Sequence, residues 1–134
     1  MTQDEFVRAA IGVPFVEHGR DYKGWDCWGL VLCAYRDVLG VTVPDFIYND
    51  TNDIRALIRN FGTRSQEFWL KVDPQPLSVA CIYRRGHVIH AGLVIGRRIL
   101  HVEQGIETCL ERIERFRVEG FYAAANIPAA SVPV

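Results

Sequence analysis

Several features that would narrow the function of this chain are missing from its sequence. The net charge of its 134 residues is only −1, so there is no basic excess that would indicate nucleic acid and no acidic tail. The N-terminus lacks the basic and apolar stretches of a signal peptide, and no apolar run is long enough to span a bilayer. We therefore expect a chain that is made in a cytoplasm, binds no nucleic acid and does not insert into a membrane.

The four cysteines include no Cys-x-x-Cys pair, which argues against a structural zinc site made of cysteines. Cys27 and Cys33 fall on different faces of one predicted helix and cannot form a disulfide there. Cys33, Cys81 and Cys109 lie among apolar residues, and we interpret them as small core residues. The length and the 49% hydrophobic content fit one globular domain.

The spacing of apolar residues changes along the chain from helical to strand-like. Helices are predicted over residues 2–11 and 27–39, and around residues 54–61, each ending near a glycine. From residue 67 onward the period is two, and strands are predicted over residues 78–83, 88–95, 98–103, 108–113 and 117–122. Helices followed by antiparallel strands define an α+β domain.

Cys27 is the first candidate for chemistry. Asp26 is suited to cap the helix that begins beside it, which places the thiol in the first helical turn, where the helix dipole favours negative charge. A thiol in that position is expected to ionise more easily than a free one. Gly29, two residues further on, indicates a close approach of another backbone or of a substrate to the helix.

Two histidines follow on predicted neighbouring strands. If residues 96–97 form a two-residue turn, Gly92 pairs with His101, and His90 becomes the diagonal neighbour of His101 on the same face. One imidazole could then act as a base while the other orients it. A lone cysteine or histidine is more often structural, and we leave His18 and His87 in that class. The three residues together favour a papain-like cysteine hydrolase.

These residues resemble a known family. Pro14-Phe15-Val16, then Gly-Trp-Asp-Cys-Trp-Gly-Leu-Val at residues 24–31, then His-Ala-Gly-Leu-Val-Ile-Gly at residues 90–96, and finally His101 are similar to the NlpC family of cell-wall cysteine peptidases. The resemblance runs from about residue 12 to residue 122 of what we expect to be a single domain over residues 1–134.

The resemblance implies a minimal papain-like α+β fold and a set of roles. Cys27 would be the nucleophile, His90 the general base and His101 the residue that orients the base. From the helix start itself, Asp26 is expected to be the cap and the backbone N–H of Cys27 to help stabilise the oxyanion. The implied substrate is the peptide stem of peptidoglycan, and no metal or organic cofactor is implied. Residues that could contact substrate are Phe15, His18, Trp25 and Trp28, although the two tryptophans could equally pack against the sheet.

The chain also departs from the family pattern. Where the family commonly has a tyrosine, this sequence has Phe15, whose ring lacks a hydroxyl; His18 or Tyr22 could supply a polar group instead. A narrower resemblance links residues 18–20, 27–30 and 118–122 to tail-associated members from tailed phages and gene transfer agents. It implies a virion tail tip that opens the cell wall, with tail hub or tail tip proteins as partners.

Three alternatives stay open at this point. The first is a structural tail-tip or baseplate component with a decayed site. The second is a metal site built from Cys27, His87, His90 and His101. The third is a different acyl chemistry, such as that of an amidase or a transferase, on the same fold.

Overall fold

The computed structural model describes residues 1–45, 68–84, 87–125, 127 and 132–134. Helix α1 (Gln3–Ala10) begins at a capping box, in which the Thr2 hydroxyl accepts a hydrogen bond from the Glu5 backbone N–H and the Glu5 carboxylate accepts one from the Thr2 backbone. Helix α2 (Cys27–Ala34) continues into a π-helical turn, η1 (Tyr35–Leu39), and ends at a left-handed glycine. Both helices confirm the predictions. The helix predicted around residues 54–61 lies outside the described residues.

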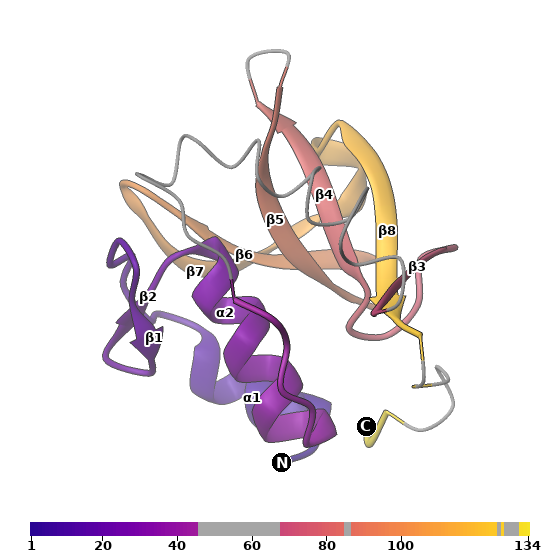
Figure 1. The fold of residues 1–134 in the computed structure, drawn as a ribbon. Helices are drawn as coiled ribbons and strands as arrows, with labels where there is room; N and C mark the ends of the chain where they lie inside the picture. Colours follow the sequence, from indigo (N-terminus) through magenta and orange to yellow (C-terminus); the bar gives the residue numbers. More distant parts are fainter. Residues whose placement is uncertain (46–67, 85–86, 126, 128–131) are drawn as a thin grey trace.

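The second half of the described chain forms a six-stranded antiparallel sheet in the order β3-β8-β4-β5-β6-β7 (Figure 1). Its strands are β3 (Trp69–Val72), β4 (Val79–Arg84), β5 (His87–Ile95), β6 (Arg98–Glu103), β7 (Ile106–Arg112) and β8 (Val118–Ala124). A short 3₁₀ turn, η3 (Ile113–Arg115), precedes β8. Strands β4 to β7 follow one another as hairpins, and β8 returns to lie between β3 and β4.

The strand predictions are confirmed for β4 to β8 within two residues at each end. The predicted two-residue turn at residues 96–97 is also correct, because Ile95 pairs with Arg98. Three strands were not predicted. Strand β3 is short and pairs on one side only, and the loop before α2 contains a small hairpin of β1 (Arg20–Asp21) and β2 (Gly24–Trp25).

The core lies between α2 and the sheet, and Figure 1 shows α1 and α2 gathered on one side of that sheet. Trp25 and Trp28 are completely buried in this core. The Trp25 ring stacks on Phe6, and its indole N–H donates a hydrogen bond to Thr108 at 2.8 Å. The two tryptophans therefore pack in the interior, which corrects the hypothesis that they line a substrate groove.

The cysteines divide into two groups. Cys33 and Cys81 are buried, which confirms their interpretation as core residues. Cys109 is only half-buried, and its sulfur lies 3.7 Å from the Nε2 atom of His101. The core interpretation was wrong for Cys109, because its strand β7 is the edge strand of the sheet. Within the described part of the chain, the helices are all too short or too polar to cross a membrane.

Candidate active site

The N-terminus of α2 is built around the carboxylate of Asp26, which is completely buried. It accepts hydrogen bonds from the backbone N–H of Gly29 at 2.9 Å, as an N-cap does, and from the backbone N–H of His18 at 2.8 Å. The guanidinium group of Arg20 donates a further bond at 2.9 Å and also pairs with Asp45 at 3.0 Å. The predicted cap is confirmed, and the carboxylate also holds the preceding loop against the helix.

Cys27 is the first residue of α2, and only 2% of its surface is exposed. Burial first, and the charge of Asp26 second, raise the pKa of its thiol to about 12, although backbone hydrogen bonds at Ala91 and Trp28 and the charge of Arg20 act in the opposite direction. The expectation of an easily ionised thiol was therefore wrong. The first turn of α2 faces the sheet rather than water, and this desolvation outweighs the helix dipole.

The two predicted strand histidines meet as expected. The Nε2 atom of His90 on β5 lies 3.0 Å from the Nδ1 atom of His101 on β6, and the rings are close to perpendicular. His101 has no exposed surface and His90 has 3%. Gly92 makes this possible, since a Cβ atom there would lie 3.2 Å from the Cβ of His101 and 2.4 Å from the side chain of Ile99. The diagonal pairing on one face is thus confirmed.

A residue that sequence reasoning missed lies behind His101. The carboxylate of Glu111 on β7 lies 2.5 Å from the Nε2 atom of His101. The signal for it was the register of the β6–β7 hairpin, in which Glu111 pairs with Ile99 and is therefore the diagonal neighbour of His101. That register could not be read from the sequence, because the β6–β7 pairing shifts at an irregularity between His101 and Glu103.

Glu111 fixes the protons along this line of side chains. A carboxylate only accepts hydrogen bonds, so the proton of neutral His101 must sit on Nε2. Its Nδ1 atom is then an acceptor, and the Nε2 atom of His90 must be the donor between the rings. Neutral His90 therefore keeps a free lone pair on Nδ1, and this atom is the one available to act as a base.

A second carboxylate lies beside His90. The Oε2 atom of Glu103 is 4.0 Å from the Nε2 atom of His90, and Glu103 is itself paired with Arg84 at 3.0 Å. Burial lowers the pKa of His90 to about 3, although the charge of Glu103 acts to raise it. The imidazole is therefore neutral at neutral pH, and a proton placed on it would be stabilised by Glu103.

The structure places the thiol next to the strand that carries His90. Cys27 meets the backbone of Ala91, the residue that follows His90 on β5. Between the described side chains of Cys27 and His90 there is no direct hydrogen bond. At neutral pH the resting site thus holds a neutral thiol, a neutral imidazole and a relay of His101 and Glu111 behind it.

The remaining sequence candidates lie elsewhere. Phe15 is half-buried, packs against the core and forms a bridge with Trp25 on β2. His18 has an exposed side chain and a positive φ of 62°, and its ring lies 3.8 Å from the Glu17 carboxylate. The hydroxyl of Tyr22 donates to Asp37 at 2.6 Å. Tyr22 is thus engaged with η1 rather than with the histidine pair.

The donor atoms that could hold a metal fall into two overlapping sets, within 4.8 Å in each. One set is His90, His101 and Glu103, and the other is His101, Cys109 and Glu111. Cys27 is in neither set, so among the described residues it does not join His90 and His101 in a metal-binding group. The side chain of His87, the fourth residue of the predicted set, lies outside the described residues.

Comparison with known proteins defines the class of fold. No family model matches the chain, and no curated protein sequence matches it. Its structure is an NlpC/p60 papain-like fold, a small α+β domain with a six-stranded antiparallel sheet. The crystal structure of the NlpC/p60 domain of the peptidoglycan hydrolase SagA superposes on it with a TM-score of 0.64 and 18% sequence identity, over 91% of this chain and 96% of that one.

Proposed function

We propose that this chain is a cysteine hydrolase that cuts stem peptides of peptidoglycan, with Cys27 as nucleophile, His90 as general base and His101 as the residue that orients the base. The observation that carries the proposal is the line of hydrogen bonds from His90 through His101 to Glu111. The strand that carries His90 lies next to Cys27, at the N-terminus of α2. The fold shared with a domain of a peptidoglycan hydrolase supports the choice of substrate.

The reaction starts from a neutral pair. Because the pKa of Cys27 is raised and that of His90 is lowered, a thiolate–imidazolium pair does not exist beforehand. The Nδ1 atom of His90 takes the thiol proton as the sulfur attacks the amide carbonyl of the substrate. The positive charge formed on His90 is stabilised through the hydrogen bond to His101 and by the nearby carboxylate of Glu103.

Collapse of the tetrahedral intermediate completes the first half. The carbonyl oxygen carries negative charge at that stage, and the backbone N–H of Cys27 at the start of α2 is suited to donate to it. His90 returns its proton to the leaving amine, the C–N bond breaks, and an acyl-enzyme forms on the sulfur. His90 then removes a proton from water, which attacks the thioester and releases the acid and the free thiol.

The test is lysis of purified peptidoglycan by the whole chain. Cys27→Ala and Cys27→Ser are expected to abolish the fall in turbidity, because neither supplies a sulfur nucleophile. Cys81→Ala is the matched control, since it removes a buried thiol that lies outside the proposed triad, and it should retain lysis. Mass spectrometry of the products identifies the cut bond and separates hydrolysis from acyl transfer. Lysis by a folded Cys27→Ala variant would exclude this mechanism.

A second candidate is a structural component on the same fold without activity. Two observations favour it: Phe15 stands where the family commonly has a tyrosine, and the resting thiol is buried and hard to ionise. In that case wild type and Cys27→Ala would both leave peptidoglycan intact. A particle that carried Cys27→Ala would then retain full infectivity.

The biological setting that we propose is the tail tip of a phage-like particle, where the chain would open the cell wall during genome delivery. Support for this setting is the sequence resemblance of residues 18–20, 27–30 and 118–122 to tail-associated proteins. Such a placement would bring a chain made in the host cytoplasm to the periplasmic wall, with tail hub or tail tip proteins as partners. Immunogold labelling or mass spectrometry of purified particles tests it directly.

A further inference from the structure

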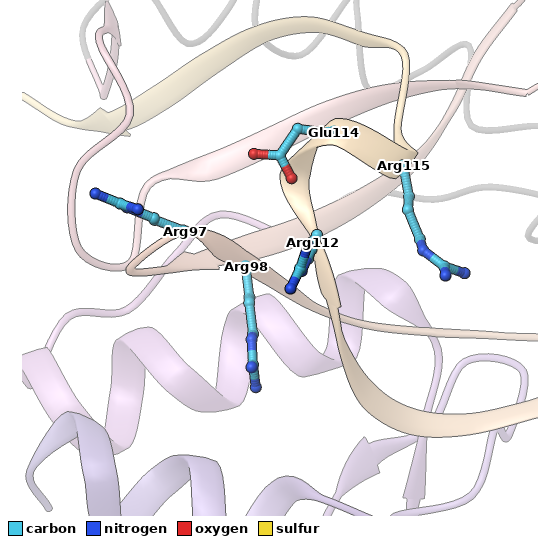
Figure 2. A pocket seen from close by; sticks show the side chains of 5 residues that line it. All are labelled: Arg97, Arg98, Arg112, Glu114 and Arg115. Carbon is cyan, nitrogen blue, oxygen red and sulfur yellow. The ribbon is translucent and has the colours of Figure 1, made fainter.

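A second feature of the molecule lies at the other end of strand β6 from the histidine pair. A cavity of about 660 Å³ is lined by Arg97, Arg98, Arg112, Glu114 and Arg115 (Figure 2). These side chains belong to the β5–β6 turn, to the facing ends of β6 and β7, and to the η3 turn. The lining holds four cations and one anion, although the chain as a whole has a net charge of −1.

Two of these arginines are placed directly opposite each other. Arg98 on β6 pairs in register with Arg112 on β7, and Figure 2 shows their side chains pointing to the same side of the hairpin. Like charges in such cross-strand positions repel and destabilise the pair. Among the described residues, no ion pair relieves this repulsion at Arg98 or Arg112, and none is formed by the neighbouring Arg97. A bound anion between them would do so.

The backbone around the cavity is held in place. The N–H of Ile113, at the start of η3, donates a hydrogen bond to the carbonyl of Arg97 at 3.2 Å, which ties the η3 segment to the β5–β6 turn. Arg115 has a carboxylate near it, that of Glu111, but the distance is 3.9 Å and the Arg115 side chain is 74% exposed. The backbone that carries the arginines is therefore held in place by a hydrogen bond. The guanidinium groups themselves can still bind an anion.

We propose that this cavity is a binding site for a phosphate group, either free or as the phosphodiester of a polymer. The two oxygens of a carboxylate are satisfied by the fork of a single guanidinium group. A phosphate has more oxygens in a tetrahedral arrangement and accepts from two or more arginines together, which fits the paired Arg98 and Arg112 of this cavity. The proposal does not rest on the proposed hydrolase activity, although Arg115 of the cavity lies near Glu111, the carboxylate behind His101. A polymer bound here would lie beside the domain.

The experiment titrates the whole chain with inorganic phosphate at low salt and follows the arginine Nε–Hε signals by NMR. Wild type is compared with the double variant Arg98→Gln/Arg112→Gln. The matched control is Arg8→Gln/Lys23→Gln, which removes the same charge from exposed positions away from the cavity. We expect saturable binding that is at least about tenfold weaker in the cavity variant and unchanged in the control.

Thermal unfolding without phosphate separates lost binding from lost structure. The cavity variant should unfold at the same temperature as wild type or above it, because the substitutions remove a repulsive pair. Failure of wild type to bind phosphate, an equal loss of binding in the control, or equally strong binding of acetate would overturn the site.

Binding of two polymers distinguishes the possible sources of the phosphate group. They are poly(glycerol phosphate) and a single-stranded oligonucleotide of equal charge. Tighter binding of the first than of free phosphate, lost in the cavity variant, supports a wall polymer as the ligand. Tighter binding of the oligonucleotide supports the phosphate site but assigns it to nucleic acid. Equal binding of both polymers by wild type and the cavity variant would contradict a specific site.

Discussion

At the scale of single residues, burial determines the protonation states of the candidate site. Cys27 and His90 are both almost completely removed from water, and burial disfavours the charged form of each. The pKa of Cys27 is therefore raised and that of His90 lowered, which leaves two neutral groups at neutral pH. In the proposed mechanism, proton transfer between them accompanies attack on the substrate, and the charge formed on His90 is balanced by the neighbouring His101 and Glu103.

The most specific prediction at this scale concerns Glu111. Glu111→Gln removes the charge behind His101 and lets the amide present either its oxygen or its N–H to the ring. Where the N–H faces His101, the proton moves to Nδ1 and is donated to His90, so that His90 loses its free Nδ1 lone pair. We expect kcat/KM for peptidoglycan fragments to fall by about 10- to 100-fold, with a smaller change in KM.

Glu107→Gln is the matched control for this prediction, because it removes the same charge from an exposed position on the same strand. Nitrogen NMR of the His101 ring gives a readout that does not depend on activity. Wild type should show the Nε2–H form, and the Glu111→Gln variant should show a mixture of the two neutral forms. Identical ring spectra in both proteins would mean that Glu111 does not set the proton position.

At the scale of elements, the site depends on how closely the loop before α2 approaches the helix. A Cβ atom at Gly29 would lie 2.1 Å from the carbonyl oxygen of Gly19 and 3.0 Å from the side chain of Trp25. Only glycine therefore allows the loop to pass over the first turn of α2. The same loop supplies the His18 N–H and the Arg20 guanidinium that bind Asp26. The close approach predicted at Gly29 is confirmed, with backbone as the neighbour.

This contact predicts the sign of a stability change. In an open helix, Gly→Ala stabilises by about 1 kcal/mol, because alanine has the higher helix propensity. Gly29→Ala should instead lower the free energy of unfolding by about 1–3 kcal/mol, because the methyl group forces the loop away from the helix. Urea unfolding followed by circular dichroism measures the change. A variant more stable than wild type would show that the loop does not pack on α2 in solution.

At the scale of the whole molecule, the parts that could be predicted are those that depend on local pattern. A few neighbouring residues are enough to predict the helix start at Asp26, the strand alternation and the turn at residues 96–97. The alternation and the turn together predicted that His90 lies next to His101. The protonation of Cys27 could not be predicted in this way. The same helix start is compatible with a thiol in water or in the core, and packing against β5 decides between them.

Other features depend on contacts between distant segments. Glu111 reaches His101 only through the β6–β7 register, and that register includes a shift which no sequence signal marks. Strand β3 forms because β8 returns to pair with β4 and offers its other edge to β3. Trp25 and Trp28 were equally suited to a groove or to a core. Their burial depends on distant segments, because Trp25 stacks on Phe6 of α1 and Trp28 lies against Trp69 of β3.

The buried histidine also gives the whole fold a pH dependence. The pKa of His90 is about 3 in the folded chain and about 6.5 when exposed, so between these values the unfolded state binds more protons than the folded state. The stabilising contribution is complete above about pH 6.5 and is lost as the pH falls towards 3. We expect the free energy of unfolding to decrease between pH 6.5 and 5, by up to about 1.4 kcal/mol per pH unit from this group. Urea unfolding across that range, where most carboxylates remain ionised, measures the slope.

The variant His90→Gln should flatten this slope, because it removes the buried titrating group. The control His18→Gln, at an exposed position, should keep the slope of wild type. The same slope in wild type and in His90→Gln would show that His90 takes up its proton without loss of structure.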